Sequence, residues 1–394
     1  MHQRYDYLII GGGMAADTAA NGIRERDTEG TIGILGEEPT APFPRPALSK
    51  KLWTDPDFTE DDAALSTHEK TGATLHLGTR ATGIDREAKA VTTDGDDTFG
   101  YGRLLLATGG HPTTIDGLDA GDRVLYFRTL TDYHRLRELT ADGPHVAVVG
   151  GGYIGTELAA ALVQNGCRVT LLHPDDTLGA PVFPASIATH LEKVFTDAGV
   201  EVRGGSKVSG GTSTADGVSL RLEHGSTVDA DVVVVGLGIT PAGDLAGAAG
   251  LRQSDDGGIV VDERLTTDDP DVLATGDVAE YPDRILGRRR VEHVDNANEM
   301  GAAAGRILAG SDETYDHTPY YYSVLFDDWY EAIGTLDSSL ETVEDHGDDG
   351  KAVVYYLDDG KVVGVLLWLV EDAKDAAREV LASGTGSPSG SIPV

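Results

Sequence analysis

Cysteine is almost absent from this sequence, since Cys167 is the only one among 394 residues. A single thiol excludes an intrachain disulfide, a Cys-x-x-Cys redox pair and a metal site built from several cysteines. Cys167 comes just before an apolar, strand-like run, so we interpret it as a buried structural thiol. We therefore expect a protein without a cysteine redox relay, and the sequence predicts no metal site.

Basic residues are also scarce: 31 Lys and Arg stand against 66 Asp and Glu, which gives a formal net charge of −35 at pH 7. So much like charge destabilises a compact protein in dilute buffer. At molar salt the Debye length falls to about 3 Å, and most of the repulsion is screened. The acids are spread along the chain, which favours a halophilic protein from a salt-filled cytoplasm over a mesophilic protein with one acidic tail. Nucleic acids and anionic membranes are disfavoured as partners.

Long apolar runs are missing as well. The longest, Val232–Leu237 and Val362–Val370, are too short to span a bilayer. No apolar stretch of the signal-peptide kind precedes the first strand-like run. These features predict a cytoplasmic protein that does not bind membranes. At roughly 150 residues per domain, the length predicts two or three domains.

Glycine, by contrast, is abundant, and its placement is informative. Gly11-x-Gly13-x-x-Ala16 follows an apolar, strand-like run and opens a helix-like stretch. In such a motif the first glycine makes a tight turn, the second admits a pyrophosphate, and the small third residue lets helix and strand pack closely. The helix N-terminus offers free N–H groups to phosphates. Glu37, after the next strand-like run, stands where an acid binds ribose hydroxyls.

The same motif recurs as Gly150-x-Gly152-x-x-Gly155, between the strand-like runs His145–Val149 and Arg168–Leu172. A single glycine turn of this kind also occurs in proteins that bind no nucleotide. Two of them, each within a strand–helix–strand unit, indicate an α/β fold with two Rossmann-like dinucleotide-binding domains. Such a chain needs two dinucleotides, and FAD with NADH or NADPH is the common pair. The alternative is two structural turns that hold no ligand.

Beyond about Pro319 the pattern changes. The runs Val353–Leu357 and Lys361–Leu369 flank a turn of two aspartates and a glycine, which predicts an antiparallel hairpin. A helix is expected over Asp372–Ala382. The Gly-, Ser- and Pro-rich end, Gly384–Val394, is expected to be a disordered tail.

Several longer segments resemble one family. They are similar to the FAD-dependent pyridine nucleotide reductases, the flavoproteins with two dinucleotide-binding domains, and within them to the branch of oxygenase-type ferredoxin reductases and apoptosis-inducing factor. The loop Arg45–Lys50 is similar to the R-P-P-L-S-K loop of that branch, with Ala47 in place of the second proline. The other matching segments are Gly155–Glu157, Thr275–Asp277, Arg290–His293, Tyr330–Gly334 and Leu336–Leu340.

The resemblance implies a domain layout. A discontinuous FAD-binding domain would span residues 1–110 and 241–318, with an NAD(P)-binding domain at 111–240 inserted between its halves. A smaller α+β C-terminal domain at 319–383 would follow, and residues 384–394 would form the flexible tail.

The resemblance also implies which residues serve the flavin. Lys50 would lie beside the flavin ring, where a fixed cation favours reduction, and Glu157 would pair with it; the alternative is two ordinary surface charges. Asp277 would bind the ribityl hydroxyls, or cap a helix, or both. The expected FAD-side residues are Gly11, Gly13, Ala16, Glu37, Arg45, Lys50, Thr108, Gly109, Gly276, Asp277, Glu292, His293 and Tyr322.

Four of these residues carry more specific expectations. Arg45 is placed near the pyrophosphate, and Glu292 and His293 near the nicotinamide pocket. For His293 the alternative is a packed histidine with a satisfied ring. Tyr322 stands where the family often has an aromatic residue against the flavin, although Trp or Phe is usual there, and the alternative is an ordinary strand residue.

The NAD side is expected to use Gly150, Gly152, Gly155, Glu157, His173, Asp175 and Gly238. His173 occupies the position where NADH sites usually carry an acid. Asp175 and Asp176 follow it, and their charges would repel the 2′-phosphate of NADPH. NADH is therefore favoured, and NADPH stays open.

The loop Arg45–Lys50 has no cysteine, so electrons are expected to leave the flavin directly. The favoured acceptor is a small iron–sulfur protein such as a ferredoxin. One alternative is an NADH oxidase that passes electrons to oxygen or a small quinone. Another is an NADH-responsive interaction protein like apoptosis-inducing factor, which the acidic charge disfavours. A homodimer is left open.

Overall fold

The computed structural model describes residues 2–384 and 388–394. The chain forms two compact units, each built from three separate segments. The first unit contains the chain up to Arg45, then Glu60–His111 and Thr240–Pro319, and the second contains Pro46–Thr59, Pro112–Ile239 and Tyr320–Val394. The strands β7 (Gly110–Pro112) and β16 (Ile239–Pro241) lie where the chain passes from one unit to the other.

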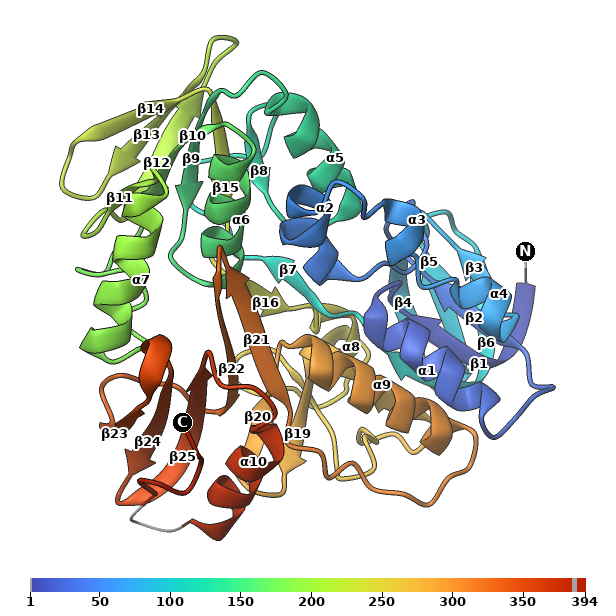
Figure 1. Cartoon of the computed structure of the whole chain (residues 1–394). Helices are drawn as coiled ribbons and strands as arrows, with labels where there is room; N and C mark the ends of the chain where they lie inside the picture. Colours follow the sequence, from blue (N-terminus) through green and yellow to red (C-terminus); the bar gives the residue numbers. More distant parts are fainter. Residues whose placement is uncertain (1, 385–387) are drawn as a thin grey trace. The chain divides into compact units, whose positions relative to one another are not determined.

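A largely parallel sheet is the centre of the first unit (Figure 1). Its strand order is β3-β2-β1-β6-β5-β4, with β18 beside β6. The parallel strands are β1 (His2–Ile10), β2 (Ile32–Leu35), β3 (Thr74–His76), β6 (Thr98–Leu106) and β18 (Val272–Ala274). The strands β4 (Ala81–Asp85) and β5 (Ala90–Thr93) pair in the antiparallel sense. Adjacent residues of β6 are buried on both faces, as is typical of a covered parallel sheet.

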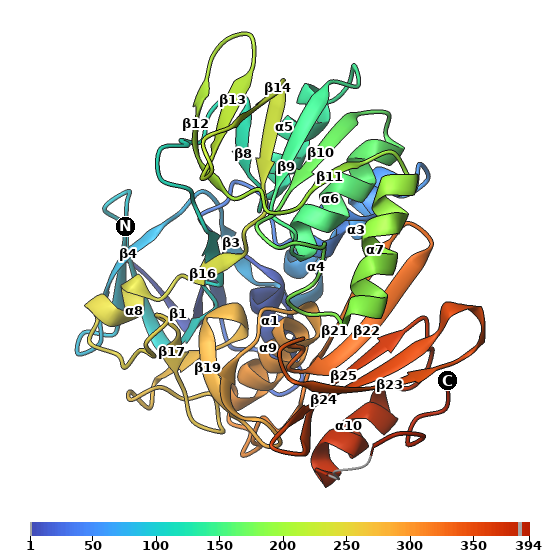
Figure 2. The same ribbon diagram turned by 90° about the vertical axis from the view of Figure 1, so that its left-hand side faces the viewer.

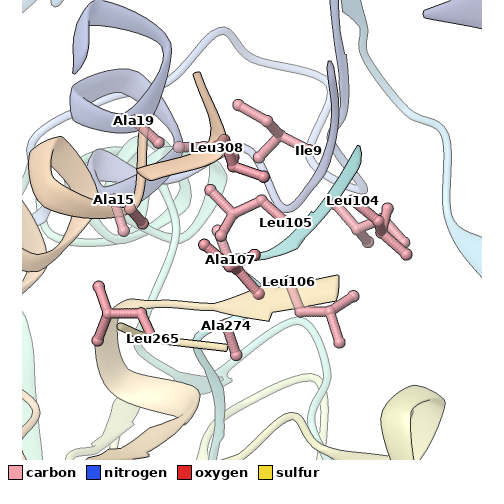
Figure 3. Packing of buried hydrophobic residues seen from close by; sticks show 14 of the residues in the cluster. Ile9, Ala15, Ala19, Leu104, Leu105, Leu106, Ala107, Leu265, Ala274 and Leu308 are labelled. Carbon is pink, nitrogen blue, oxygen red and sulfur yellow. The ribbon is translucent and has the colours of Figure 1, made fainter. Parts of the chain in front are cut away.

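Two helices cover this sheet and lie side by side in both ribbon views, α1 (Met14–Arg24) and α9 (Val294–Leu308) (Figures 1 and 2). Small residues allow this close approach, because a Cβ built on Gly305 would lie 2.0 Å from the carbonyl oxygen of Ala19. The apolar core that the helices share with the sheet is drawn in Figure 3. The rest of this unit consists of α3 (Glu60–Ala63), α4 (Thr67–Thr71), α8 (Asp244–Ala248), the 3-10 helix Gly276–Val278, and the strands β17 (Ile259–Val260), β19 (Ala279–Asp283) and β20 (Gly287–Arg290).

The second unit has its own five-stranded parallel sheet, in the order β11-β10-β9-β15-β8. These strands are β8 (Val124–Tyr126), β9 (His145–Val149), β10 (Arg168–Leu172), β11 (Glu201–Arg203) and β15 (Val232–Val235). The helices α5 (Leu130–Leu139), α6 (Tyr153–Gln164) and α7 (Ala185–Asp197), and the antiparallel strands β12 (Val208–Ser213), β13 (Val218–Leu222) and β14 (Thr227–Ala230), complete this part.

A five-stranded antiparallel sheet, in the order β21-β22-β25-β24-β23, also belongs to the second unit (Figure 2). Its strands are β21 (Tyr320–Leu325), β22 (Asp328–Gly334), β23 (Glu341–His346), β24 (Ala352–Asp358) and β25 (Lys361–Trp368), and α10 (Lys374–Ser383) follows them. The expected hairpin is β24–β25. Both turn residues, Asp359 and Gly360, have positive φ, as a two-residue hairpin turn requires.

The segment Pro46–Thr59 lies in the second unit, whereas the layout from sequence groups it with residues 1–110. Its anchor is Trp53, which is buried, meets the ring of Tyr133 edge-on at 5.5 Å and lies under the guanidinium of Arg137. Helix α2 (Lys51–Thr54) carries this tryptophan. The sequence pattern does not show that Trp53 packs with residues more than 70 positions further along the chain.

The C-terminal residues differ from the disordered tail expected from composition. Residues 385–387 lie outside the described part of the chain. Ile392 is 1% exposed, and its N–H donates to the hydroxyl of Tyr355 at 3.2 Å. The carboxylate of Asp345 accepts hydrogen bonds from the Gly390 N–H and the Ser389 hydroxyl. One apolar side chain and one carboxylate therefore hold this segment against β23 and β24.

Among the described residues, no helix combines the length and the apolar character needed to cross a membrane.

Candidate functional site

The first glycine turn joins β1 to α1. Gly11 has φ +117°, and a Cβ there would lie 2.1 Å from the carbonyl oxygen of Ala107, so any other residue would be strained and would clash. Gly13 precedes the helix in an extended conformation, and no atom lies within 4 Å of a Cβ built on it. Ala16 is fully buried against the core. The turn thus exposes backbone and the start of a helix, which suits an approaching pyrophosphate.

The second glycine turn, between β9 and α6, has the same construction. Gly150 has φ +119°, and its Cβ would lie 2.4 Å from the carbonyl oxygen of Gly236. A Cβ on Gly155 would lie 1.9 Å from the carbonyl oxygen of Gly150, whereas one on Gly152 would meet nothing within 4 Å. Both turns therefore fit a dinucleotide by the same criterion: glycine where the backbone is crowded, and open space before the helix.

The structure brings the expected pair Lys50 and Glu157 together within the second unit. The ammonium nitrogen of Lys50 lies 2.7 Å from Glu157 Oε1, and the two side chains are 17% and 3% exposed. Glu157 is therefore no ordinary surface charge. Tyr322, also in this unit, has its ring centroid 5.4 Å from the Lys50 nitrogen and is 37% exposed.

Two serines that the sequence did not single out, Ser49 and Ser323, form a cluster with Lys50 and Glu157. The hydroxyl of Ser49 donates to Glu157 Oε2 at 2.6 Å, and the hydroxyl of Ser323 donates to Oε1 at 2.7 Å. Ser49 is adjacent to Lys50 in the loop that carries the family resemblance, which is the one signal that points to it. Ser323 gives no such signal.

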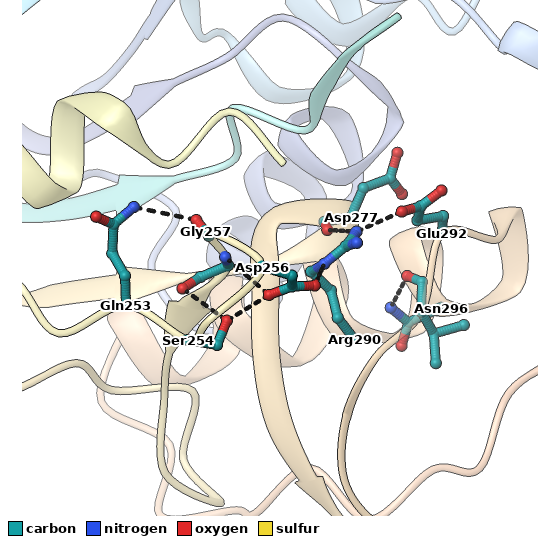
Figure 4. A network of polar contacts seen from close by, with 10 residues as sticks. Gln253, Ser254, Asp256, Gly257, Asp277, Arg290, Glu292 and Asn296 are labelled. Atoms are coloured by element: carbon teal, nitrogen blue, oxygen red, sulfur yellow. Dashed lines mark hydrogen bonds and ion pairs between the residues drawn. The ribbon is translucent and has the colours of Figure 1, made fainter. Parts of the chain in front are cut away.

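Arg290 organises the polar residues of the first unit (Figure 4). Its guanidinium donates to the carbonyl of Asp277 at 3.0 Å, to Glu292 at 2.5 Å and to Asp256 at 2.9 Å. Hydrogen bonds from Ser254 and Arg290 lower the pKa of Asp256 to about 2, against the opposing effect of its partial burial. Arg290 thus fixes the main chain at Asp277 and ties it to Glu292, a role that the sequence did not predict.

His293 directly precedes α9 and is the residue that caps this helix with its main chain. Burial lowers the pKa of His293 to about 4, although the nearby Asp277 and Asp295 oppose that shift. The imidazole is therefore neutral at pH 7, and it cannot act there as a fixed cation.

The remaining FAD-side residues have ordinary structural contacts. Arg45 forms an ion pair with Glu38 at 2.6 Å. Glu37 lies 3.8 Å from Arg80, and both side chains are more than half exposed, so this pair is weak. The hydroxyl of Thr108 donates to the carbonyl of Ala242 at 2.8 Å. Gly109 and Gly276 both have the positive φ that glycine adopts without strain.

His173 at the end of β10 is deeply buried rather than presented to solvent. It is 1% exposed, and a Cβ built on Gly151 would lie 3.1 Å from the His173 Cβ. Within the described chain neither ring nitrogen has a hydrogen-bond partner, and burial lowers its pKa. Asp175 is half-buried and Asp176 exposed, so these two carboxylates carry the negative charge at this end of the strand.

Gly238, the last of the expected NAD-side residues, has φ +82° and an open Cβ position, and its carbonyl accepts a hydrogen bond from the Thr113 N–H.

Comparison with known proteins identifies the family. The family model for pyridine nucleotide-disulphide oxidoreductases matches residues 5–301. A ferredoxin–NAD(+) reductase component of the anthranilate 1,2-dioxygenase system of Burkholderia cepacia is 34% identical over 388 residues, covering 96% of this chain and 94% of that protein. Monodehydroascorbate reductase 3 of Arabidopsis thaliana is 32% identical, covering 92% of this chain and 89% of its own.

A solved structure is similar over the same length. The chain of a covalent putidaredoxin reductase–putidaredoxin complex matches with a TM-score of 0.87 and 29% identity, covering 96% of this chain and 93% of that one. Together with the two glycine turns, these similarities agree with the fold and the cofactors expected from sequence. The chain belongs to the pyridine nucleotide-disulphide oxidoreductase family and is an FAD oxidoreductase that uses NAD(P)H.

Proposed function

We propose that this enzyme passes electrons from NADH through FAD to a small ferredoxin-type iron–sulfur protein. The observation that carries the proposal is the full-length similarity to a ferredoxin–NAD(+) reductase component, in a chain with a single, buried cysteine. The similarity to the reductase in the putidaredoxin reductase–putidaredoxin complex also supports a ferredoxin partner. Because Cys167 is 5% exposed and directly precedes β10, we do not expect its thiol to relay electrons.

The two glycine turns suggest where each dinucleotide binds. The turn at Gly11 and Gly13, with Asp277, would hold FAD, and the turn at Gly150 and Gly152 would hold the nicotinamide coenzyme. When bound, FAD accepts a hydride and releases electrons, while the protein supplies orientation and electrostatics. Lys50 would supply the fixed positive charge beside the flavin, and Glu157 would hold that charge in place.

The remaining expected residues keep their proposed roles. Arg45 would lie near the pyrophosphate, Glu292 and His293 near the nicotinamide, and Tyr322 against the flavin ring. Arg290, through its bonds to the Asp277 main chain and to Glu292, would position that part of the FAD site.

NADH is the proposed coenzyme. Asp175 and Asp176 stand just beyond β10, where an NADPH site needs positive charge for the 2′-phosphate. His173 adds none, because burial lowers its pKa and favours the neutral ring.

Anaerobic stopped-flow spectroscopy tests this proposal. The FAD-loaded enzyme, in high salt, is mixed with NADH or NADPH and then with ferredoxin, a soluble quinone, oxygen or the monodehydroascorbate radical. We expect faster reduction by NADH and faster reoxidation by ferredoxin than by the other acceptors. Faster reduction by NADPH would refute the coenzyme assignment. Rapid reoxidation by the radical alone would instead favour the activity named for the Arabidopsis relative.

A further inference from the structure

We propose that Ser49 and Ser323 are positioning residues that hold the Glu157 carboxylate, and through it the Lys50 ammonium, in the arrangement that makes the flavin easy to reduce. This inference rests on the proposed role of Lys50 beside the flavin.

The side chains of Ser49, Ser323 and Lys50 all contact the Glu157 carboxylate. Oε2 accepts from the Ser49 hydroxyl at 2.6 Å, and Oε1 accepts from the Ser323 hydroxyl at 2.7 Å. Oε1 also lies 2.7 Å from the Lys50 nitrogen. Both carboxylate oxygens therefore have a neutral donor, and one of them has the ammonium as well. This arrangement fixes the rotation of the carboxylate plane.

Three separate stretches of the second unit supply these donors and the acceptor. Ser49 ends the 3-10 helix Arg45–Ser49, Glu157 lies in the second turn of α6, and Ser323 lies on β21. In sequence Ser49 is 108 residues from Glu157, and Ser323 is 166 residues from it. Tertiary structure alone brings them together, so the cluster is specified by the fold and not by a local turn.

The direction of the Ser323 side chain follows from the strand. Along β21, side chains alternate between the two faces, so Tyr322 and Val324 are exposed while Ser323 is 1% exposed. The edge-on contact between Tyr321 and Tyr153, with ring centroids 5.7 Å apart, fixes the same buried face of β21 against α6. A hydroxyl on this face has a buried carboxylate within reach and no access to bulk water.

Burial makes the two hydroxyls important. Burying a carboxylate away from water costs free energy unless its oxygens accept hydrogen bonds. Hydrogen bonds in which the acceptor is charged are stronger than those between two neutral groups. The two serine donors hold the Glu157 carboxylate in the orientation in which its Oε1 lies 2.7 Å from the Lys50 ammonium. If either hydroxyl is removed, the carboxylate is free to rotate, the Lys50 ammonium shifts with it, and the cation is no longer held where it favours flavin reduction.

The test uses the FAD-loaded enzyme and two measurements, the two-electron midpoint potential of the flavin and its rate of reduction at saturating NADH. For Ser49→Ala or Ser323→Ala we expect the potential to fall by about 30 mV, a tenfold change in the reduction equilibrium constant. The reduction rate should fall about tenfold, and the Kd for FAD should stay the same. Ser323→Thr, which keeps the hydroxyl, should behave as the wild type.

The background Glu157→Gln separates positioning from a general loss of packing. If the serines act through the carboxylate, Ser49→Ala should shift the potential in the wild type but cause no further shift with Glu157→Gln. Thr140→Val is the matched control, because it removes a buried hydroxyl of the same unit that donates to the carbonyl of Leu136. It should leave the potential unchanged.

Equal potentials for Ser49→Ala, Ser323→Ala and Thr140→Val, together with a lowered potential for Lys50→Met, would overturn this inference and leave the proposed function intact. A wild type that NADH does not reduce would instead overturn the proposed function. Should an alanine variant fail to fold, Ser323→Cys provides the same test, because a thiol of similar size is a weaker donor and should give a smaller shift in the same direction.

Discussion

At the scale of single residues, the central feature is the ion pair between the Lys50 ammonium and the buried Glu157 carboxylate. Glu157 is almost inaccessible to water, and Lys50 is the charge that compensates it. Removing one partner of such a pair leaves the other uncompensated, which typically destabilises a protein by about 3–5 kcal/mol. The stability effect of Lys50 and its proposed electrostatic effect on the flavin must therefore be separated experimentally.

Lys50→Met should slow flavin reduction by NADH about tenfold or more, because it removes the positive charge proposed to lie beside the ring. It should change the Kd for FAD much less. Stopped-flow reduction and flavin fluorescence titration measure the two quantities. The double variant Lys50→Met with Glu157→Gln should recover thermal stability without recovering the reduction rate. Unchanged reduction kinetics in Lys50→Met would show that this ion pair is structural only.

His293 gives a second prediction, on pH. The unfolded imidazole has a pKa near 6.5, and burial lowers the folded pKa to about 4. The unfolded state therefore binds the proton first, and stability is lost as the pH falls from about 6.5 to about 4. By this linkage, His293 accounts for a loss of about 2–3 kcal/mol between pH 7 and pH 4.5.

Urea unfolding of wild type and His293→Gln at those two pH values measures the effect, since the difference between them removes the contribution of other groups. We expect a smaller acid loss in the variant. Equal losses would mean that folding does not shift the pKa of His293.

At the scale of secondary-structure elements, each glycine turn contains glycines that close packing requires and a glycine that leaves open space for a ligand. A Cβ on Gly155 would collide with the main chain of Gly150, whereas one on Gly152 would point into open space. The φ of Gly152 is −84°, which alanine also adopts. These two glycines therefore form a matched pair within one turn.

Gly155→Ala should destabilise the protein by about 3 kcal/mol, because α6 must move away from β9. Gly152→Ala should leave stability within about 0.5 kcal/mol of wild type and still raise the Kd for NADH at least tenfold, because its methyl group occupies the space for the pyrophosphate. Thermal denaturation and calorimetric titration check the pair. Normal NADH affinity in Gly152→Ala would place the coenzyme elsewhere.

The glycine turns and the strands and helices beside them were predictable because each is a local pattern of apolar residues and glycines. The runs at residues 5–10, 31–35, 145–149 and 168–172 all became strands of parallel sheets. The packing of Trp53 was not predictable, since its partners are Tyr133 on α5 and Asn165, which directly follows α6. The expectation of a disordered tail was wrong for residues 388–394, because composition does not show that Ile392 is buried and that its N–H bonds to Tyr355. Ser49 and Ser323 were missed because a serine becomes functional here only through a distant carboxylate.

At the scale of the whole molecule, the main physical feature is the excess of acidic residues over basic ones. With a net charge of −35, the chain repels itself and any acidic partner in dilute buffer. At molar salt the Debye length falls to about 3 Å, so most of this repulsion is screened. Because screening weakens this repulsion, we expect the protein to gain helical circular dichroism and thermal stability as KCl is raised.

The most direct measurement is the rate at which the NADH-reduced enzyme transfers electrons to an acidic ferredoxin, followed across a KCl series. All points lie above the salt concentration at which far-UV circular dichroism shows complete folding, so that the fold does not change within the series. We predict a rapid reoxidation whose rate rises with salt, because screening removes the repulsion between two acidic proteins. A neutral quinone, used as a control, should show no such rise. A ferredoxin rate that stays negligible at every salt concentration, beside fast reoxidation by quinone or oxygen, would contradict the account.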